Sequence, residues 1–276
     1  MCRLYGQIAL NRADAKDFLV YSERSFFLQS HYRKTNPQRD GWGLGFFDGP
    51  KAKIVKSRKP IVQEKNRFFD LASRTRSKVI IGHLRAASNP RGLLKKKLIG
   101  VENSQPFGTG SIVFAHNGTL QIPDEVLAHM GPFAENVKGV NDSEVYFWHW
   151  MKWFKKTKSA PKALELCIRE IWRIWAQCRR LYPHKKYPYT GLNTLISDGK
   201  SLHAFCHYPY GSSAEQRSLF GGQKWGVMSA GLRDDRWIVS SEDLDSTRWE
   251  RLKDGEIVSA RIESGKIKLN RTLVRI

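Results

Sequence analysis

The feature that most constrains the fold is the placement of two long amphipathic helices between two groups of short apolar strands. The helices are expected over 141–156 and 161–182, the first opened by an Asn or Asp cap and the second by Pro161 near its first turn. Runs typical of strands precede and follow them, at 4–10, 40–49, 52–57, 78–88, 111–120, 192–199, 201–208, 224–230, 236–241, 255–263 and 266–272. This order predicts an α+β fold in which helices are layered on two antiparallel sheets.

Two further helices are expected in the first third of the chain, over 13–30 and near 66–76. Neither an internal repeat nor a convincing linker is visible, so we expect a single domain over 1–276 with a helical excursion at about 143–190. The sequence also contains no apolar run of about 18 residues, the length that spans a membrane. We therefore expect neither a signal peptide nor a membrane segment.

The four cysteines argue for a reducing environment. They form neither a CxxC pair nor the Cys/His spacing of a zinc site, and they are Cys2, Cys167, Cys178 and Cys206. Cys167 and Cys178 can share a helix face, but the helix between them holds them too far apart for a disulfide. We expect a cytoplasmic protein with no metal. We also expect no cofactor, because the glycine-rich stretch at 41–45 is followed by a strand rather than by the helix of a nucleotide-binding motif.

Positive charge is concentrated in the first third of the chain. The net charge is +21, and residues 1–100 hold 22 Lys and Arg against 7 Asp and Glu. Such a surface attracts anions, acidic proteins, nucleic acid or membranes without choosing among them, and an ordinary solvated surface explains it equally well. Charge alone therefore leaves the partner open.

Five residues at the ends of predicted elements carry the candidate chemistry. If the initiator Met is removed, Cys2 holds a free α-amine beside its own thiol and so combines a base with a nucleophile. Arg85 follows one apolar strand, Asn117 and Gly118 end another, and Asp142 opens a helix. Each also has an ordinary structural explanation: a surface ion pair for Arg85, a tight turn for Asn117-Gly118 and a helix cap for Asp142.

The order of the motifs is more specific than any one of them. Nearly the whole chain is covered by a series that runs MCRLYG, RDGWG, GHLRAAS, ENSQPF, AHNGTL, NDSEV and IVSSEDLD with a downstream DGEIV. In this order the motifs resemble those of the class II glutamine amidotransferases of the N-terminal nucleophile hydrolase superfamily, above all the small stand-alone members. Family members commonly carry Thr or Ser after the Arg motif, and Ser88 can fill that place. The resemblance implies a four-layer αββα sandwich.

The resemblance also implies a role for each of the five residues. The thiolate of Cys2 attacks the side-chain amide of glutamine or a γ-glutamyl compound and forms a γ-glutamyl thioester, with its own α-amine as base. Asn117 and Gly118 stabilise the charge that develops on the amide oxygen. Arg85 binds the α-carboxylate of the substrate, and Asp142 pairs with its α-ammonium group.

Several alternatives stay open at this point. His83 and His116 lie beside motifs, but a histidine on an apolar strand is usually a satisfied core residue, and the α-amine makes a histidine base unnecessary. The protein could pass ammonia to an acceptor enzyme, hydrolyse a γ-glutamyl compound, or be a catalytically idle basic adaptor for nucleic acid or an acidic partner. The basic loop Arg91–Lys97 and the Trp-rich helices are candidate contacts for a partner. We favour a small-molecule substrate over nucleic acid and expect no membrane binding, and the sequence does not indicate an oligomeric state.

Overall fold

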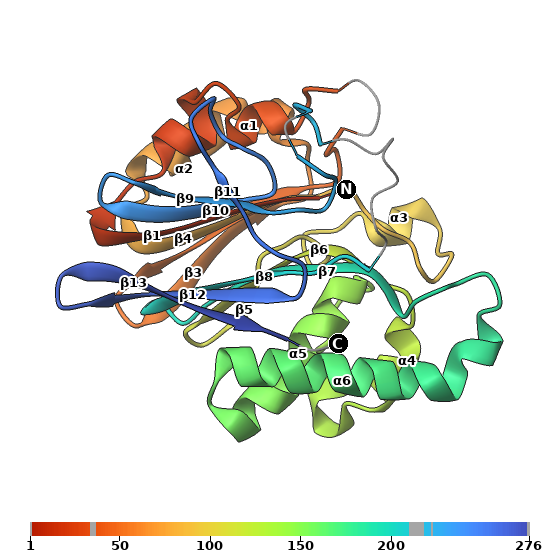
Figure 1. Cartoon of the computed structure of the whole chain (residues 1–276). Helices are drawn as coiled ribbons and strands as arrows, with labels where there is room; N and C mark the ends of the chain where they lie inside the picture. Colours follow the sequence, from red (N-terminus) through yellow and green to blue (C-terminus); the bar gives the residue numbers. More distant parts are fainter. Residues whose placement is uncertain (1, 34–36, 210–217, 222, 275–276) are drawn as a thin grey trace.

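The computed structural model describes residues 2–33, 37–209, 218–221 and 223–274. Its strands form two antiparallel sheets that lie face to face, and helices cover the outer face of each sheet (Figure 1). The layers therefore follow the order helices, sheet, sheet, helices. This arrangement confirms the predicted α+β fold class and the four-layer αββα sandwich, whereas the assignment of 1–276 to a single domain stays a prediction.

The first sheet has the strand order β11-β9-β10-β1-β4-β2-β3. Its strands are β1 (Arg3–Ala13), β2 (Trp42–Asp48), β3 (Lys51–Ser57), β4 (Ser77–Leu84), β9 (Ser229–Arg233), β10 (Arg236–Ser240) and β11 (Glu250–Arg251). β1 pairs with β10 on one side and with β4 on the other. The strand that follows Cys2 therefore lies in the middle of this sheet, with a neighbouring strand on each side.

The second sheet has the order β13-β12-β8-β7-β6-β5. Its strands are β5 (Phe107–Thr109), β6 (Ile112–Leu120), β7 (Tyr189–Ser197), β8 (Ser201–Cys206), β12 (Glu256–Glu263) and β13 (Lys266–Leu273). The register of β6 against β7 shifts between Gly118 and Leu120, which marks a β-bulge near the end of β6.

Three hydrophobic clusters hold the four layers together. The first lies under η1 (Asp17–Tyr21), α1 (Phe26–Gln29) and α2 (Lys65–Arg74), the second between the sheets, and the third under α5 (Asp142–Thr157) and α6 (Ala160–Cys178). Tyr5 belongs to the first cluster and Leu4 to the second, because successive strand residues point to opposite faces. Trp150 of α5 packs in the third. The Trp-rich helices are thus explained in large part as a core layer.

The prediction of one helix over 13–30 is wrong. The chain there forms the end of β1, then η1, and then α1 as a separate turn of helix. Ser25 starts α1, because its hydroxyl accepts a hydrogen bond from the N–H of Leu28 at 3.2 Å. The N–H of Arg24 instead donates to the carbonyl of Leu244 at 3.0 Å, far along the chain. A local cap and a long-range contact therefore interrupt the periodic pattern.

Several short elements were not predicted. They are β5, β11, η2 (Ile61–Glu64), α3 (Lys95–Leu98), α4 (Pro123–Ala128) and η3 (Gly131–Asn136). The helix expected over 161–182 ends at Cys178 and continues as the 3-10 turn η4 (Arg179–Leu181). The strand expected at 224–230 begins only at Ser229. The carbonyl of Gly226 accepts a hydrogen bond from the Asn193 side chain at 2.6 Å, which ties the preceding residues to β7 instead. Within the described residues, no helix is both long and apolar enough to cross a bilayer.

Four buried histidines make the stability of the fold depend on pH. Burial lowers the pKa of His83 to about 3 and that of His203 to about 4, and it also lowers the pKa of His116 and His149. In the unfolded chain each histidine takes up a proton near its ordinary pKa of about 6.5. Below that pH the unfolded state binds more protons than the folded state, so stability is lost as the pH falls.

We expect the free energy of unfolding to fall between pH 7 and pH 5, by up to about 1.4 kcal/mol per histidine for each pH unit. His203→Gln should make this dependence shallower, because it removes one titrating group near the Ser259 hydroxyl, which lies 2.8 Å from Nδ1. Urea unfolding at several pH values measures the effect, with the exposed His184→Gln as the matched control. A free energy of unfolding that is flat over this range would contradict the prediction.

Candidate active site

The thiol of Cys2 lies just before β1, against the loop that follows β4. Its Sγ is 3.4 Å from both the backbone N and the carbonyl O of Ala86, and the residue is 8% exposed. Burial raises the pKa of this thiol. A thiol in this state needs a base to take its proton when it attacks a substrate. Met1 lies outside the described residues, so its removal stays a prediction.

Arg85 directly precedes Ala86, whose backbone contacts this thiol. Its Nη1 donates to the carbonyl oxygens of Asp40 at 3.2 Å and Leu98 at 2.9 Å, and the residue is 3% exposed. Burial lowers the pKa of the guanidinium, and Cys2 and nearby carboxylates oppose that effect. Within the part of the chain that the structure describes, Nε and Nη2 have no hydrogen-bond partner. The guanidinium is therefore held in place with donors left for an anion.

The RDGWG motif supports the loop that carries Arg85. Asp40 accepts a hydrogen bond from the N–H of Ala87 at 2.8 Å, and Gly41 accepts one from the N–H of Arg85 at 2.8 Å. Gly41 has a φ of +127°, and a Cβ there would lie 2.6 Å from the carbonyl oxygen of Ser57. Only glycine fits at this point. The RDGWG motif contains Asp40, but its order in the sequence does not indicate this role for the carboxylate.

Asp142 is the first residue of α5, but its side chain does not cap the helix. The cap is Asn141, whose side chain accepts a hydrogen bond from the N–H of Ser143 at 2.9 Å. The Asp142 carboxylate instead accepts hydrogen bonds from the Ser88 hydroxyl and the N–H of Leu120, both at 2.7 Å. The residue is 1% exposed. Asn141, and not Asp142, is therefore the cap of this helix.

The β-bulge in β6 connects Asp142 to the Asn-Gly pair. Both Asn117 and Gly118 lie within β6, so the tight-turn explanation of this pair is wrong. The register shift after Gly118 turns the N–H of Leu120 toward the Asp142 carboxylate. Gly118 has a φ of +155°, and a Cβ there would lie 1.9 Å from the carbonyl oxygen of Gly191. A side chain at this position is therefore excluded by the neighbouring strand.

Asn117 is buried and lines a small cavity that also borders Arg3 and Trp225. Its Oδ1 has no hydrogen-bond partner among the described residues. A buried amide with an unsatisfied end is rare and costs about 1–3 kcal/mol. Sites that bind a ligand commonly contain such groups.

Gln105 of the SQPF motif supports the strand that carries Asn117. Its side-chain amide donates to the carbonyl of His116 at 3.0 Å and accepts from the N–H of His116 at 2.7 Å. The His116 ring lies 2.9 Å from the Ser143 hydroxyl and 3.0 Å from the carbonyl oxygen of Gly191, so it is a satisfied core residue. His83 is also buried, but neither of its ring nitrogens has a partner among the described residues.

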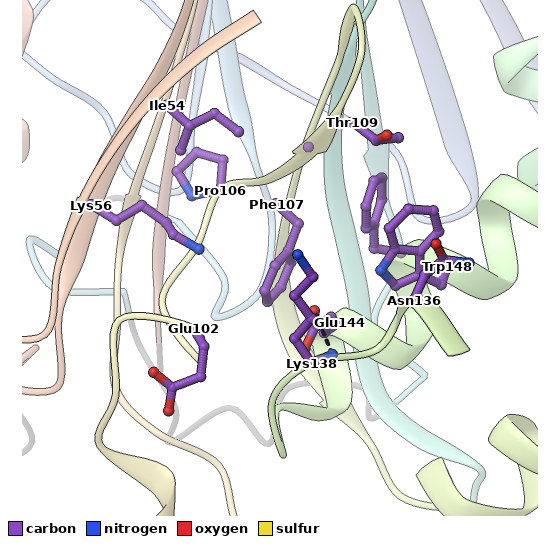
Figure 2. Close-up of a pocket in the computed structure, with 12 residues that line it drawn as sticks. Ile54, Lys56, Glu102, Pro106, Phe107, Thr109, Asn136, Lys138, Glu144 and Trp148 are labelled. Carbon is purple, nitrogen blue, oxygen red and sulfur yellow. Dashed lines mark hydrogen bonds between the residues drawn. The ribbon is translucent and has the colours of Figure 1, made fainter. Parts of the chain in front are cut away.

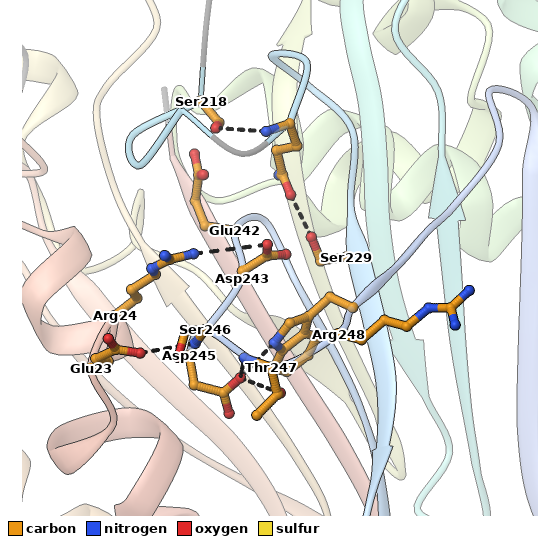
Figure 3. A network of polar contacts seen from close by, with 12 residues as sticks. Glu23, Arg24, Ser218, Ser229, Glu242, Asp243, Asp245, Ser246, Thr247 and Arg248 are labelled. Carbon is orange, nitrogen blue, oxygen red and sulfur yellow. Dashed lines mark hydrogen bonds and ion pairs between the residues drawn. The ribbon is translucent and has the colours of Figure 1, made fainter.

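An ion pair supports the residue after Cys2. Arg3 donates to the carbonyl of Cys2 at 3.3 Å and lies 3.8 Å from the Glu242 carboxylate. Figure 3 shows that Glu242 belongs to a loop fixed by polar contacts. Within it, Asp243 lies 4.0 Å from Arg24 of the outer helical layer. The IVSSEDLD motif thus connects that helical layer to the N-terminal strand.

No metal-binding arrangement is visible in the described ranges, where no three His, Cys, Asp or Glu side chains converge. All four cysteines are free and buried. The absence of a cofactor stays a prediction.

Comparison with known proteins identifies the family of the chain. The family model described as glutamine amidotransferases class-II matches residues 1–217. The chain belongs to this family. Among solved structures, a glutamine amidotransferase class-II domain protein from Silicibacter pomeroyi has a TM-score of 0.64 at 18% identity, with 98% of each chain covered. The glutamine phosphoribosylpyrophosphate amidotransferase of Bacillus subtilis has a TM-score of 0.62 at 18% identity, with 98% of this chain and 49% of that chain covered. At this identity both structures show the shared fold alone.

A curated relative of this class II amidotransferase matches over a shorter region. The gamma-glutamyl-hercynylcysteine sulfoxide hydrolase of Mycobacterium tuberculosis is 34% identical over 98 residues. The match covers 36% of this chain and 38% of the relative, well under two thirds of its length. Family and relative together support an amide-cleaving activity in general terms.

Proposed function

We propose that this class II glutamine amidotransferase cleaves the side-chain amide of glutamine or a γ-glutamyl compound through a γ-glutamyl thioester on Cys2. The observation that carries the proposal is the convergence of one thiol, one cation and one anion in a buried site. The Cys2 thiol contacts the backbone of Ala86, the residue after Arg85, and the charges of Arg85 and Asp142 both act on the thiol. A nucleophile near two opposite charges suits a substrate with an amino-acid end.

The thiol and the α-amine of mature Cys2 perform the first step. The amine takes the thiol proton, the sulfur bonds to the amide carbon, and the carbon–nitrogen bond breaks as the leaving nitrogen takes that proton. Water then hydrolyses the thioester and releases the γ-carboxylate. Because burial raises the pKa of the thiol, the amine is needed as the base in this scheme.

Asn117 and Gly118 are proposed to stabilise the oxyanion of the tetrahedral intermediate. This role requires Nδ2 of the Asn117 amide to donate to the oxyanion, and the close packing of Gly118 against Gly191 fixes the backbone at this point. Loss of one such donor costs about a hundredfold or more in rate.

Arg85 and Asp142 are proposed to bind the charged end of the substrate. The free guanidinium donors of Arg85 suit a carboxylate. Each carboxylate oxygen of Asp142 already accepts one hydrogen bond and can accept another from an ammonium group. Both side chains recognise only the glutamyl part, which glutamine and a γ-glutamyl compound share. The name of the mycobacterial relative supports a hydrolase of a γ-glutamyl compound, while transfer of ammonia to an acceptor enzyme is the second candidate.

Intact-mass analysis after incubation with a diazoketone analogue of glutamine tests the proposal. We expect one adduct per chain, located on Cys2 by peptide mapping, in a protein that has lost Met1. Glutamine should protect against labelling, because both compounds occupy the same site. Labelling of another cysteine, or none in folded protein, would contradict the proposed nucleophile.

The basic loop Arg91–Lys97 is proposed to attract an anionic substrate or partner to the site. The Arg91 guanidinium already donates hydrogen bonds to the Asp124 carboxylate at 2.7 Å and to the carbonyl of Val140 at 2.8 Å. The three lysines of α3 are exposed.

Neutralising Lys95, Lys96 and Lys97 together should lower kcat/KM and leave kcat unchanged. Surface charge changes the rate at which substrate and enzyme associate, not the rate of the chemical step. We expect a severalfold effect at low salt that disappears at about 1 M salt, where the Debye length is about 3 Å. The control variant neutralises two other exposed lysines, Lys51 and Lys53, on the hairpin formed by β2 and β3. Identical salt profiles for wild type and variant would exclude a role for α3 in encounter.

A further inference from the structure

A cavity of about 430 Å³ lies outside the candidate active site (Figure 2). It opens where the edge strands β3 and β5 of the two sheets meet the start of α5, and Cys2, Arg85, Asn117 and Asp142 do not line it. Cavities of this size hold small ligands. The proposed reaction gives this cavity no role.

Two ammonium groups extend into the cavity from opposite walls. Lys56 comes from β3 and Lys138 from the loop before α5, and Figure 2 shows both side chains directed toward the Phe107 ring. Neither ammonium group has a hydrogen bond or an ion pair among the described residues. The Lys56 nitrogen lies 5.3 Å from the Phe107 ring centre, and burial lowers the pKa of this lysine although Glu144 and Glu102 oppose the effect. A half-buried cation with neither a hydrogen bond nor an ion pair to the described residues favours the binding of an anion.

The two carboxylates in the lining are already engaged. Glu144 accepts hydrogen bonds from the backbone N–H groups of Lys138 at 3.1 Å and Gly139 at 2.8 Å. Glu102 is exposed and accepts one from the Asn103 side chain at 3.2 Å. The lysines therefore supply the cations of the cavity, while the carboxylates limit its net positive charge. This balance suits an anion of low charge.

Flat rings form the remaining wall. The rings of Phe107 and Phe147 are stacked with their centres 6.2 Å apart, and the ring centres of Phe147 and Trp148 are 4.9 Å apart. Phe107, Phe147 and Trp148 all line the cavity. Such a wall packs against a planar group and gives binding energy beyond that of the charge.

We propose that this cavity binds a small anion that carries a flat apolar ring system. The anionic group lies between Lys56 and Lys138, and the rings pack against Phe107 and Trp148. The site is separate from the proposed hydrolysis, because Cys2, Arg85, Asn117 and Asp142 do not line it.

Two fluorescent probes separate the roles of charge and ring. The sulfonate 8-anilinonaphthalene-1-sulfonate is an anion with flat rings, and N-phenyl-1-naphthylamine has the same rings without the charge. We expect the sulfonate to bind the full-length protein saturably at one site. Lys56→Met and Lys138→Met should each weaken it about tenfold, the scale of one charge-assisted hydrogen bond. The neutral probe should bind both variants as it binds the wild type, and Trp148→Ala should weaken both probes.

Lys53→Met is the matched control, because Lys53 lies on the same strand but is exposed and pairs with Asp48 at 2.7 Å. It should bind both probes like the wild type. Cys2→Ala should do so too, which keeps this test independent of the proposed hydrolysis. The proposal is overturned if the wild type shows no saturable site, or if the folded Lys56 and Lys138 variants keep the wild-type affinity. Equal weakening by Lys53→Met would also overturn it, because the sulfonate would then respond only to overall charge.

Discussion

Cys2→Ala should abolish turnover of glutamine and of every γ-glutamyl substrate while the fold stays intact. The variant loses the sulfur that would form the proposed thioester, so this covalent route is closed. The fold should tolerate the change, because the polar contacts of Sγ to the described residues are weak ones, at 3.4 Å, with the backbone of Ala86. Kinetics with thermal unfolding of the same preparation measure both effects. We expect a loss of at least about four orders of magnitude, as for other enzymes that lose their nucleophile.

The other three cysteines are the matched controls. Cys167 lies 3.2 Å from His149 in the helical layer, and Cys206 accepts a hydrogen bond from the N–H of Met228 at 3.5 Å between the sheets. Burial raises the pKa of Cys206 to about 12, which makes it a poor nucleophile. Ala or Ser at Cys167, Cys178 or Cys206 should leave the chemistry unchanged. Loss of activity in a folded Cys206→Ser protein would move the nucleophile away from Cys2.

Retention of Met1 should inactivate the protein as completely as loss of the thiol. The nitrogen of Cys2 would then belong to a peptide bond and could not accept a proton. Because burial raises the pKa of the thiol, no thiolate would form readily without that base. Active protein whose intact mass still includes Met1 would refute this mechanism.

The sequence predicted the layers of the fold because each layer has its own periodicity. Trp150 and its neighbours on α5 follow the helical repeat that packs them on the second sheet. Leu4 and Tyr5 point to opposite faces of β1, as a strand buried on both sides requires. The pattern at 13–30 failed because Arg24 bonds to Leu244, a contact that no local window contains.

The candidate site was predicted from motif order, but its supporting residues were not. Asp40 holds the Arg85 loop, and Gln105 holds the backbone of His116 beside Asn117. Both contacts join segments far apart along the chain, so spacing alone does not show them. The cap of α5 was ambiguous between two adjacent residues, and only the geometry separates Asn141 from Asp142.

Asp142→Asn should remove the discrimination between a substrate with a free α-amine and the same substrate acetylated on that amine. The acetylated substrate presents no cation, so the buried Asp142 carboxylate would be left unpaired in the wild type. Leaving one partner of a buried charge pair alone costs about 2–5 kcal/mol, which corresponds to at least about a thirtyfold preference for the free amine. In the Asn variant this preference should fall to a few-fold. The ratio of kcat/KM values for the two substrates measures the effect.

A ratio separates substrate binding from stability, because a folding defect lowers both activities equally and leaves the ratio unchanged. The substitution should also preserve the local structure. The Asn carbonyl oxygen can still accept from the N–H of Leu120, and the Asn amide can donate to the Ser88 hydroxyl that now donates to Asp142. Asn141→Ala is the control, because it removes the helix cap and should lower stability by about 1 kcal/mol without changing the ratio. If folded Asp142→Asn loses both activities in equal proportion, Asp142 only fixes the bulge of β6, and another group must bind the ammonium end.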